Sequence, residues 1–204
     1  DGLDVARAMI DEAAKANPTL ATLIVLAADT GARRGELCAL RWRHVDVEAG
    51  TLRIEAAIGE TNVVYEKDTK THQHRTVTLS SFALDWLLDH RDRHAKACAL
   101  CGIELRYDAY VLAPEPGGLK PLHPSSATRA FSRLRDRMEL SSWIHLHGLR
   151  HLQVTQLLDA GVPLRSVSGR VGHRNPSTTT NIYAHWIQES DAGSAEVVDG
   201  RIWR

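Results

Sequence analysis

The sequence is short of cysteine and of long apolar runs. Its 204 residues include three cysteines. Three thiols cannot all pair within the chain, which argues against a disulfide framework and favours a reducing compartment. The longest uniformly apolar run, LIVLAA at residues 23–28, is far too short to span a bilayer, and we see no charged-then-apolar leader. We therefore expect a cytoplasmic globular protein with no membrane partner.

An excess of charge of either sign is also missing. The chain has 25 Lys and Arg residues against 25 Asp and Glu residues, so its formal net charge is zero. Bulk charge therefore neither favours nor excludes a polyanionic partner, and a nucleic-acid site has to come from local clusters. No paired set of carboxylates stands out as a two-metal site.

One stretch has the residue types of a zinc site without the geometry. His90, His94, Cys98 and Cys101 are spaced at i, i+4, i+8 and i+11 along one expected helix. At 1.5 Å per residue they cover ~16 Å, so a straight helix cannot bring all four round one ion. If the helix ended near Cys98, three of them could converge. We expect no bound metal, and stoichiometric zinc in the purified protein would overturn this.

Apolar periodicity, caps and turn residues predict a mainly helical chain. We expect helices at 3–16, 19–30, 34–40, 81–98, 125–138, 147–160, 163–171 and 177–186. Gly31 and Gly172 are placed to end two of them, and Ser81 to cap another. Stretches rich in β-branched residues predict strands at 51–57, 62–65 and 75–79. The fold class is therefore α+β, mainly α-helical with a small antiparallel three-stranded sheet.

Two patterns in the second half of the chain could carry chemistry, although each alone fits an ordinary structural role. In HGLRH, His147 and Arg150 are three residues apart, which puts imidazole and guanidinium on one helical face. His173 follows the helix-breaking Gly172, so its ring is free to point outward. Tyr183 stands among small polar residues in PSTTTNIYAHW, where a tyrosine usually fills half-buried space.

Two further patterns lie in the first half. In TGARRGELCALRW, Arg33 stands at a helix break with Glu36 three residues later, well placed for an ion pair that would fix the arginine. A solvated arginine pair at a helix start is the alternative. In TKTHQHRTVTL, Lys70 occupies a polar turn between two strands, from which a lysine can reach over a ligand. Arg34 and Lys67 are the neighbours most easily confused with Arg33 and Lys70.

Together these patterns resemble the tyrosine recombinases of the phage integrase family. The resemblance runs from about residue 20 to residue 186 and rests on TGARRGELCALRW, TKTHQHRTVTL, HGLRH, GVPLRSVSGRVGH and STTTNIYAH, in this order and spacing. It implies a catalytic set of six residues, with Glu36 supporting the first arginine. The set is Arg33, Lys70, His147, Arg150, His173 and Tyr183. Leu152 and Gln153 depart from the Thr-Phe or Ser-Phe usual in this family, which affects local packing.

The resemblance also implies an activity and partners. The protein would be a site-specific DNA recombinase that cleaves and rejoins strands through a covalent 3′-phosphotyrosine, without a cofactor. Its partner would be double-stranded DNA at specific sites, with a tetramer on DNA and a monomer or weak oligomer alone. Residues 1–190 would form the catalytic domain and 191–204 a tail exchanged between protomers, with a core-binding domain upstream of this chain. We expect a bacterial or phage-encoded protein associated with the nucleoid.

The chemistry explains why such a set is needed. A phenol with an ordinary pKa of ~10 is a poor nucleophile at neutral pH until its proton is drawn off and the phosphate charge is masked. Arginines suit the second task because their planar forks bind phosphate oxygens in pairs and stay charged. Of the remaining groups, His147 would accept the tyrosine proton, His173 would donate to a phosphate oxygen and Lys70 would protonate the departing 5′ oxygen.

Weaker signals concern contacts to DNA. Four arginines on one expected helix form a basic cluster that is either a solvated face or a phosphate-tracking face. They are Arg129, Arg133, Arg135 and Arg137. We expect Trp42 and Trp143 in the core rather than stacked on bases.

Two other functions use the same features. A catalytically inactive DNA-binding module of the same fold is one, and the complete six-residue set argues against it. Nicking and resealing of the type IB topoisomerase kind is the other, and the spacing of the motifs and the small size argue against it.

Overall fold

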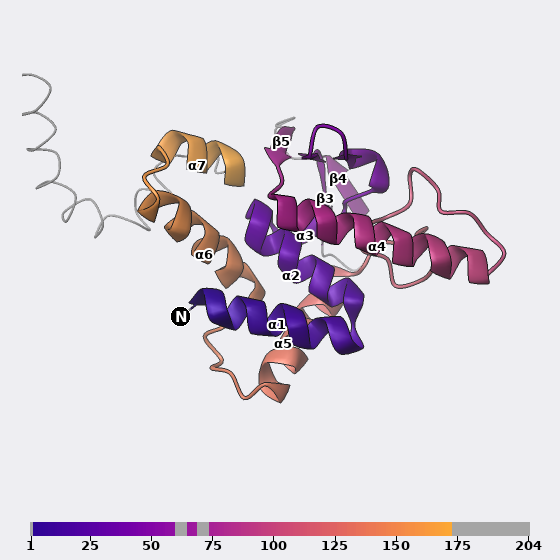
Figure 1. The fold of residues 1–204 in the computed structure, drawn as a ribbon, viewed down its shortest axis with the longest axis horizontal. Coiled ribbons are helices and arrows are strands. Elements are labelled where there is room, and N and C mark those ends of the chain that lie inside the picture. Colours follow the sequence, from indigo (N-terminus) through magenta and orange to yellow (C-terminus); the bar gives the residue numbers. More distant parts are fainter. Residues whose placement is uncertain (1, 60–64, 69–73, 173–204) are drawn as a thin grey trace, which may run out of the picture.

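The structure is a computed structural model that describes residues 2–59, 65–68 and 74–172, with the backbone alone at 65–68. Helices make up most of this part of the chain (Figure 1). They are α1 (Gly2–Ala16), α2 (Pro18–Thr30), α3 (Arg34–Cys38), the 3₁₀ helix η1 (Trp42–His44), α4 (Ser81–Leu100), α5 (Pro124–Arg137), α6 (Leu146–Asp159) and α7 (Leu164–Val171). The strands are β1 (Val45–Asp46), β2 (Thr51–Ile54), β3 (Ala56–Gly59), β4 (Tyr65–Asp68) and β5 (Arg75–Thr78).

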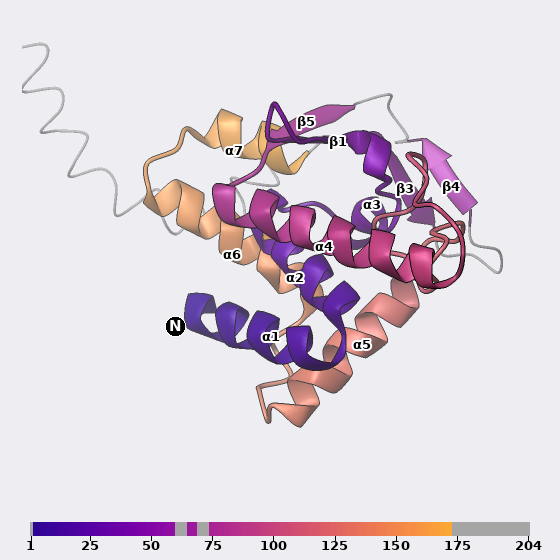
Figure 2. The same cartoon turned by 45° about the vertical axis from the view of Figure 1, so that its right-hand side comes forward.

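Helix α2 forms the centre of the fold. Nine of its 13 residues are buried, so it is apolar on every side, as a helix enclosed by others must be. It packs against α1, α4 and α6 (Figure 2). Its start is fixed by Asn17, whose side chain accepts from the backbone N–H of Leu20, and by Pro18 in the first turn. Its end is fixed by Gly31, at φ 61°.

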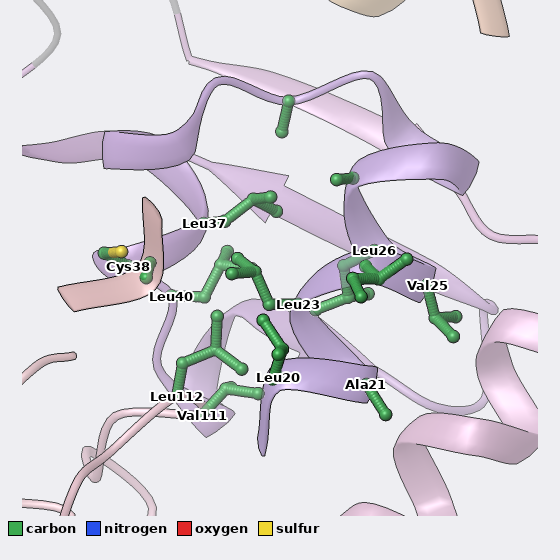
Figure 3. Packing of buried hydrophobic residues seen from close by; sticks show 14 of the residues in the cluster. Leu20, Ala21, Leu23, Val25, Leu26, Leu37, Cys38, Leu40, Val111 and Leu112 are labelled. Carbon is green, nitrogen blue, oxygen red and sulfur yellow. The ribbon is translucent and has the colours of Figure 1, made fainter. Parts of the chain in front are cut away.

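The core around α2 is aliphatic. Figure 3 shows Leu20 and Leu23 of α2 in one cluster with Leu37 of α3, Leu40 and Leu112. The three leucines at 23, 37 and 112 have no exposed surface. Because α3 is only five residues long, this packing rather than helix propensity holds it in place. The core therefore fixes the α2–α3 junction, which contains Arg33.

The strands form two small units, which differs from the single three-stranded sheet expected from the sequence. Antiparallel β1, β2 and β5 make one sheet in that order, and β3 pairs only with β4 among the described residues. The expected strand 51–57 is divided at Glu55, whose carboxylate accepts from Nε2 of His44 at 2.8 Å and pairs with Nε of Arg53 at 2.9 Å. These bonds hold the chain where it leaves the first sheet for the second.

Most expected helices are present within one or two residues of their expected ends, and the α+β, mainly helical fold class is confirmed. Ser80 rather than Ser81 caps α4, since its hydroxyl accepts from the backbone N–H of Ala83 at 3.2 Å. The expected helix 177–186 lies outside the described residues. In the part of the chain that is described, no helix has the length and apolar character needed to cross a bilayer.

The C-terminal end of α7 is brought against the first half of the chain. Val167 and Val171 of α7 pack on Val154 of α6, and α6 in turn packs along α2. Figures 1 and 2 both show α7 beside α6, with β5 next to it. Three segments distant in sequence thus meet here, namely the start of α3, the start of β5 and the end of α7.

Candidate active site

Glu36 lies at the centre of this meeting point. Its buried carboxylate accepts from the backbone N–H of Arg33 at 2.8 Å and from Nη1 of Arg33 at 3.0 Å. Arg75 binds both carboxylate oxygens with its fork, at 3.1 Å and 2.7 Å. Burial raises the pKa of Glu36, but the hydrogen bonds and charges of Arg75 and Arg33 outweigh it and leave the pKa below its ordinary value. Glu36 is therefore ionised at neutral pH.

The last carbonyl groups of α7 hold the guanidinium groups of three arginines. These carbonyls lack helical partners and carry the negative end of the helix dipole. The three pairs are Arg75 Nε to Arg170 O at 3.0 Å, Arg150 Nη1 to Val171 O at 2.6 Å, and Arg33 Nη2 to Gly172 O at 2.9 Å. Arginines from β5, α6 and the α2–α3 junction are thus fixed on one short stretch of backbone.

Arg150 is a buried cation with one unused donor. Its residue surface is 3% exposed, and Nη1 also donates to Gly31 O. Its Nη2 has no hydrogen-bond partner among the described residues. Burial, followed by the charge of Arg33, lowers the pKa of Arg150 to about 10, so it remains protonated at neutral pH. A fixed guanidinium with a free N–H is suited to an anion.

Two glycines are required for this close packing. A Cβ at Gly31 would lie 2.2 Å from the Gln153 side chain, and one at Gly172 would lie 2.7 Å from Nη1 of Arg75. Both glycines have positive φ, at 61° and 70°, which disfavours any other residue.

His147 stands at the start of α6 on the same side as the arginines. Its ring is exposed and meets the His151 ring edge-on, with centroids 4.8 Å apart. Partial desolvation, followed by the charges of His151, Arg150 and Arg33, lowers the pKa of His147. The imidazole is therefore mainly neutral at neutral pH and can accept a proton.

A groove of about 410 Å³ opens beside these residues. Arg33, Arg34, His145 and His147 contribute its basic lining, and none of the described residues that line it is acidic. Arg34 also donates to the Thr128 hydroxyl on α5, another lining group. The groove thus has the electrostatics of an anion site.

Three members of the expected catalytic set, Lys70, His173 and Tyr183, lie outside the described residues. Of the others, the structure brings Arg33 and Arg150 to the same carbonyl stretch, with His147 and Glu36 close by. In sequence, Lys70 precedes Arg75 by five residues and His173 directly follows Gly172.

The sequence prediction missed Arg75, although TKTHQHRTVTL contains it. Alternate residues of a strand share a face, and Val77, two residues on, is buried. An arginine on the core-facing side of a strand needs a buried partner. This alternation was the available signal.

Comparison with known proteins decides the family. The phage integrase family model matches residues 3–189, which is most of the chain.

The chain belongs to the phage integrase family.

A tyrosine recombinase XerC-like protein of Caldanaerobacter subterraneus subsp. tengcongensis is 30% identical over 93% of the chain and 51% of its own length. An integrase of Streptomyces ambofaciens is 32% identical over 87% of the chain and 47% of its own length. The chain therefore spans about half the length of the curated relatives it matches.

Solved structures show the same fold at lower identity. The Tn1549 transposon integrase in complex with transposon right end DNA superposes with a TM-score of 0.76 at 21% identity, covering 94% of this chain and 63% of that one. XerA recombinase gives 0.67 at 20% identity, covering 86% and 56%. The resemblance inferred from the sequence motifs is thereby confirmed at the level of family and fold.

The four arginines of α5 differ in exposure and in their partners. Arg129 and Arg133 are exposed, whereas Arg135 has a side chain 16% exposed that binds Asp136 and the carbonyls of Ser142 and Ile144. The fourth, Arg137, lies 3.8 Å from the Glu12 carboxylate. At 100° per residue, Arg129 and Arg133 point about 100° and 140° away from the groove-lining Thr128.

The two tryptophans differ, and the expectation for one was wrong. Trp42 is buried and donates to Nδ1 of His94 at 3.2 Å. Trp143 was expected in the core but is 88% exposed. Arg135 binds the carbonyl groups on either side of it, which holds that short loop with the ring outward.

Three of the four candidate zinc ligands are hydrogen-bonded to backbone carbonyl groups. Nε2 of His90 bonds to Val111 O, and both Nε2 of His94 and Sγ of Cys98 bond to Pro116 O, each at 2.8 Å. Cys101 is exposed. Within residues 2–59 and 74–172, no three His, Cys, Asp or Glu side chains are grouped to hold a metal ion.

Proposed function

We propose that this chain is the catalytic domain, residues 1–190, of a site-specific DNA recombinase that cleaves and rejoins double-stranded DNA through a covalent 3′-phosphotyrosine. The observation that carries the proposal is the convergence of Arg33 and Arg150 on the end of α7, beside a basic groove. Family membership supports it, as do relatives named as a tyrosine recombinase and an integrase. Solved neighbours include an integrase in complex with DNA.

The two arginines would neutralise the scissile phosphate. Arg150 is held through Nη1, and its buried Nη2 has no hydrogen-bond partner among the described residues, so Nη2 is the group that would donate to a non-bridging oxygen. Arg33, with a side chain 48% exposed, borders the groove. Each donor directed at the charge that grows in the transition state can contribute about 3 kcal/mol.

The remaining groups would move protons. Tyr183 Oη forms a bond to phosphorus while the bond from phosphorus to the 5′ oxygen breaks. The phenol proton passes to His147, whose lowered pKa keeps a nitrogen free to accept it, and Lys70 gives a proton to the 5′ oxygen. His173 donates to a phosphate oxygen. The 5′ hydroxyl of a second strand then reverses the step, so one phosphodiester replaces another without ATP or a metal ion.

The test is strand cleavage by the intact protein on a nicked DNA substrate, from which the short fragment that carries the new 5′ hydroxyl diffuses away after cleavage. Wild type should form a covalent protein–DNA product in EDTA and without ATP. Tyr183→Phe, which removes one hydroxyl, should bind the DNA and form none. A covalent product from Tyr183→Phe would remove the assignment. Relaxation of supercoils without joining of two sites would indicate a topoisomerase.

We also propose that residues 191–204 pass between protomers of a tetramer on DNA. This segment contains Ile202 and Trp203, two apolar residue types that suit docking on a protein surface. Deletion of residues 192–204 should weaken tetramer formation on DNA in gel filtration with light scattering, with single-site binding retained. Unchanged assembly would contradict the proposal.

A further inference from the structure

Arg75 is the best-anchored side chain at the site, yet it does not border the groove. Its fork binds both oxygens of Glu36, and its Nε donates to Arg170 O. The side chain is 12% exposed and is absent from the groove lining. With Nε and both Nη atoms engaged, Arg75 acts on other residues rather than on a ligand.

The orientation of the Arg33 side chain depends on the position of the Glu36 carboxylate. The Arg33 side chain is about half exposed, and within the described residues its guanidinium is held by Glu36 Oε1 and Gly172 O. A free arginine side chain has about 2 kcal/mol of rotamer entropy to lose. Arg33 can meet a phosphate in one orientation only if the Glu36 carboxylate is itself fixed. Arg75 fixes it by occupying both oxygens.

Arg75 also links the three segments that build the site. It is the first residue of β5, it holds Glu36 of α3, and it holds the last turn of α7. The chain on either side carries two expected catalytic residues, with Lys70 five residues before Arg75 and His173 directly after Gly172. The space between Arg75 and Gly172 is so small that a Cβ at Gly172 would clash with the guanidinium.

We propose that Arg75 is a positioning residue for strand cleavage, which acts through Glu36 to hold Arg33 in its phosphate-binding orientation. This inference rests on the proposed recombinase function. It predicts that Arg75 affects the rate of the chemical step more than DNA affinity, because it touches no ligand. It also predicts that the effect of Arg75 disappears when Glu36 can no longer transmit it.

The experiment is a double-mutant cycle on single-turnover cleavage by the intact protein at saturating nicked DNA. Arg75→Lys keeps the charge but loses the fork, and should slow cleavage by about 10-fold or more with the DNA Kd changed less than about twofold. Glu36→Gln should slow it comparably. The double variant should be no slower than Glu36→Gln alone, because residues in one network are not additive.

Arg41→Lys is the matched control. Arg41 is a partly buried arginine remote from the groove that binds Asp108 O and the Tyr110 hydroxyl. The Arg41→Lys substitution should lower the thermal midpoint of unfolding and leave the cleavage rate unchanged. If Arg41→Lys slows cleavage as much as Arg75→Lys at an equal loss of thermal midpoint, the effect is one of stability and the inference is overturned.

The remaining outcomes are distinct. Wild-type cleavage by Arg75→Lys, or additive losses in the cycle, would overturn the inference and leave the proposed function standing. Wild-type protein that forms no covalent product would overturn both. If Arg75→Lys does not fold, Arg75→Gln combined with Glu36→Gln removes both charges together. A loss equal to that of Glu36→Gln alone then supports the inference, and a further loss contradicts it.

Discussion

Within the described part of the chain, two largely buried polar clusters are built in opposite ways. The Glu36 cluster consists of Glu36, Arg33, Arg75 and Arg150, and it holds three guanidinium groups against one carboxylate. The histidine cluster consists of His90, His94, Trp42 and Cys98. Burial lowers the pKa of His90 to about 4 and also lowers that of His94, so this cluster is neutral at neutral pH.

The difference agrees with a structural role for the histidine cluster and with the phosphate-binding role that we propose for the Glu36 cluster. In the histidine cluster the ring nitrogens bond within the protein, apart from Nδ1 of His90, which is an uncharged acceptor. In the Glu36 cluster positive charge is in excess, and Arg150 keeps a free donor. Unbalanced buried charge costs stability. A cluster that retains it beside an open groove is organised for an anionic ligand.

The largest effect should come from removing a guanidinium from the Glu36 cluster. Arg150→Ala or Arg33→Ala should slow single-turnover cleavage ~10²-fold or more, because each takes a donor from the phosphate. His90→Gln, which alters the histidine cluster instead, should cleave at close to the wild-type rate. The measurement is covalent product formation on nicked DNA. Near wild-type cleavage by either alanine variant would count against the two-arginine site.

As the pH falls, the histidine cluster should lose its contribution to the free energy of unfolding before the Glu36 cluster does. The folded pKa of His90, about 4, lies below its ordinary value, so its contribution to stability is complete above pH ~6.5 and is lost as the pH falls toward 4. Between pH 7 and 4.5 this amounts to about 2 kcal/mol. Glu36 also has a lowered pKa, but its contribution is present above pH ~4.5 and is lost only below that.

Urea unfolding at pH 7 and pH 4.5 checks this prediction. His90→Gln should lose less free energy of unfolding over this interval than wild type does. Glu36→Gln should keep the wild-type pH dependence there. An identical pH dependence in wild type and His90→Gln would show that His90 is not buried in the neutral form.

The smallest effects should come from the exposed arginines of α5, outside both clusters. Arg129→Gln or Arg133→Gln should weaken DNA binding severalfold and reduce the slope of log K against log salt by about 1 if each meets one phosphate. Arg135→Gln is the comparison, because Arg135 holds the loop carbonyls of Ser142 and Ile144. It should lower thermal stability and leave the slope unchanged in fluorescence anisotropy. An unchanged slope for Arg129→Gln and Arg133→Gln would remove them from the DNA surface.

Features that depend on neighbouring residues, such as helix ends and short-range ion pairs, could be predicted from the sequence. Gly31 and Gly172 end α2 and α7 in left-handed conformations, as their positions after expected helices indicated. The Arg33–Glu36 pair was also expected, since only three residues separate the partners. These features depend on neighbouring residues, so local pattern was sufficient.

Contacts between residues that are distant in the sequence could not be predicted. Arg75 and Glu36 are 39 residues apart, and Arg150 bonds to Gly31 across 119 residues. The direct pairing of β2 with β5 and the separate β3–β4 unit depend on how the chain turns at Glu55. Trp143 was expected in the core rather than stacked on bases, whereas Arg135 fixes its loop with the ring in solvent. Each outcome depends on tertiary contacts that periodicity does not encode.

The most direct test of the central claim is to identify the residue joined to DNA. The intact protein is trapped on nicked DNA, digested with nuclease and protease, and the phosphonucleotide-bearing peptide is sequenced by mass spectrometry. The account predicts that the modified residue is Tyr183, joined to a 3′ phosphate. Attachment at any other side chain, or cleaved DNA with no attached peptide, would contradict it.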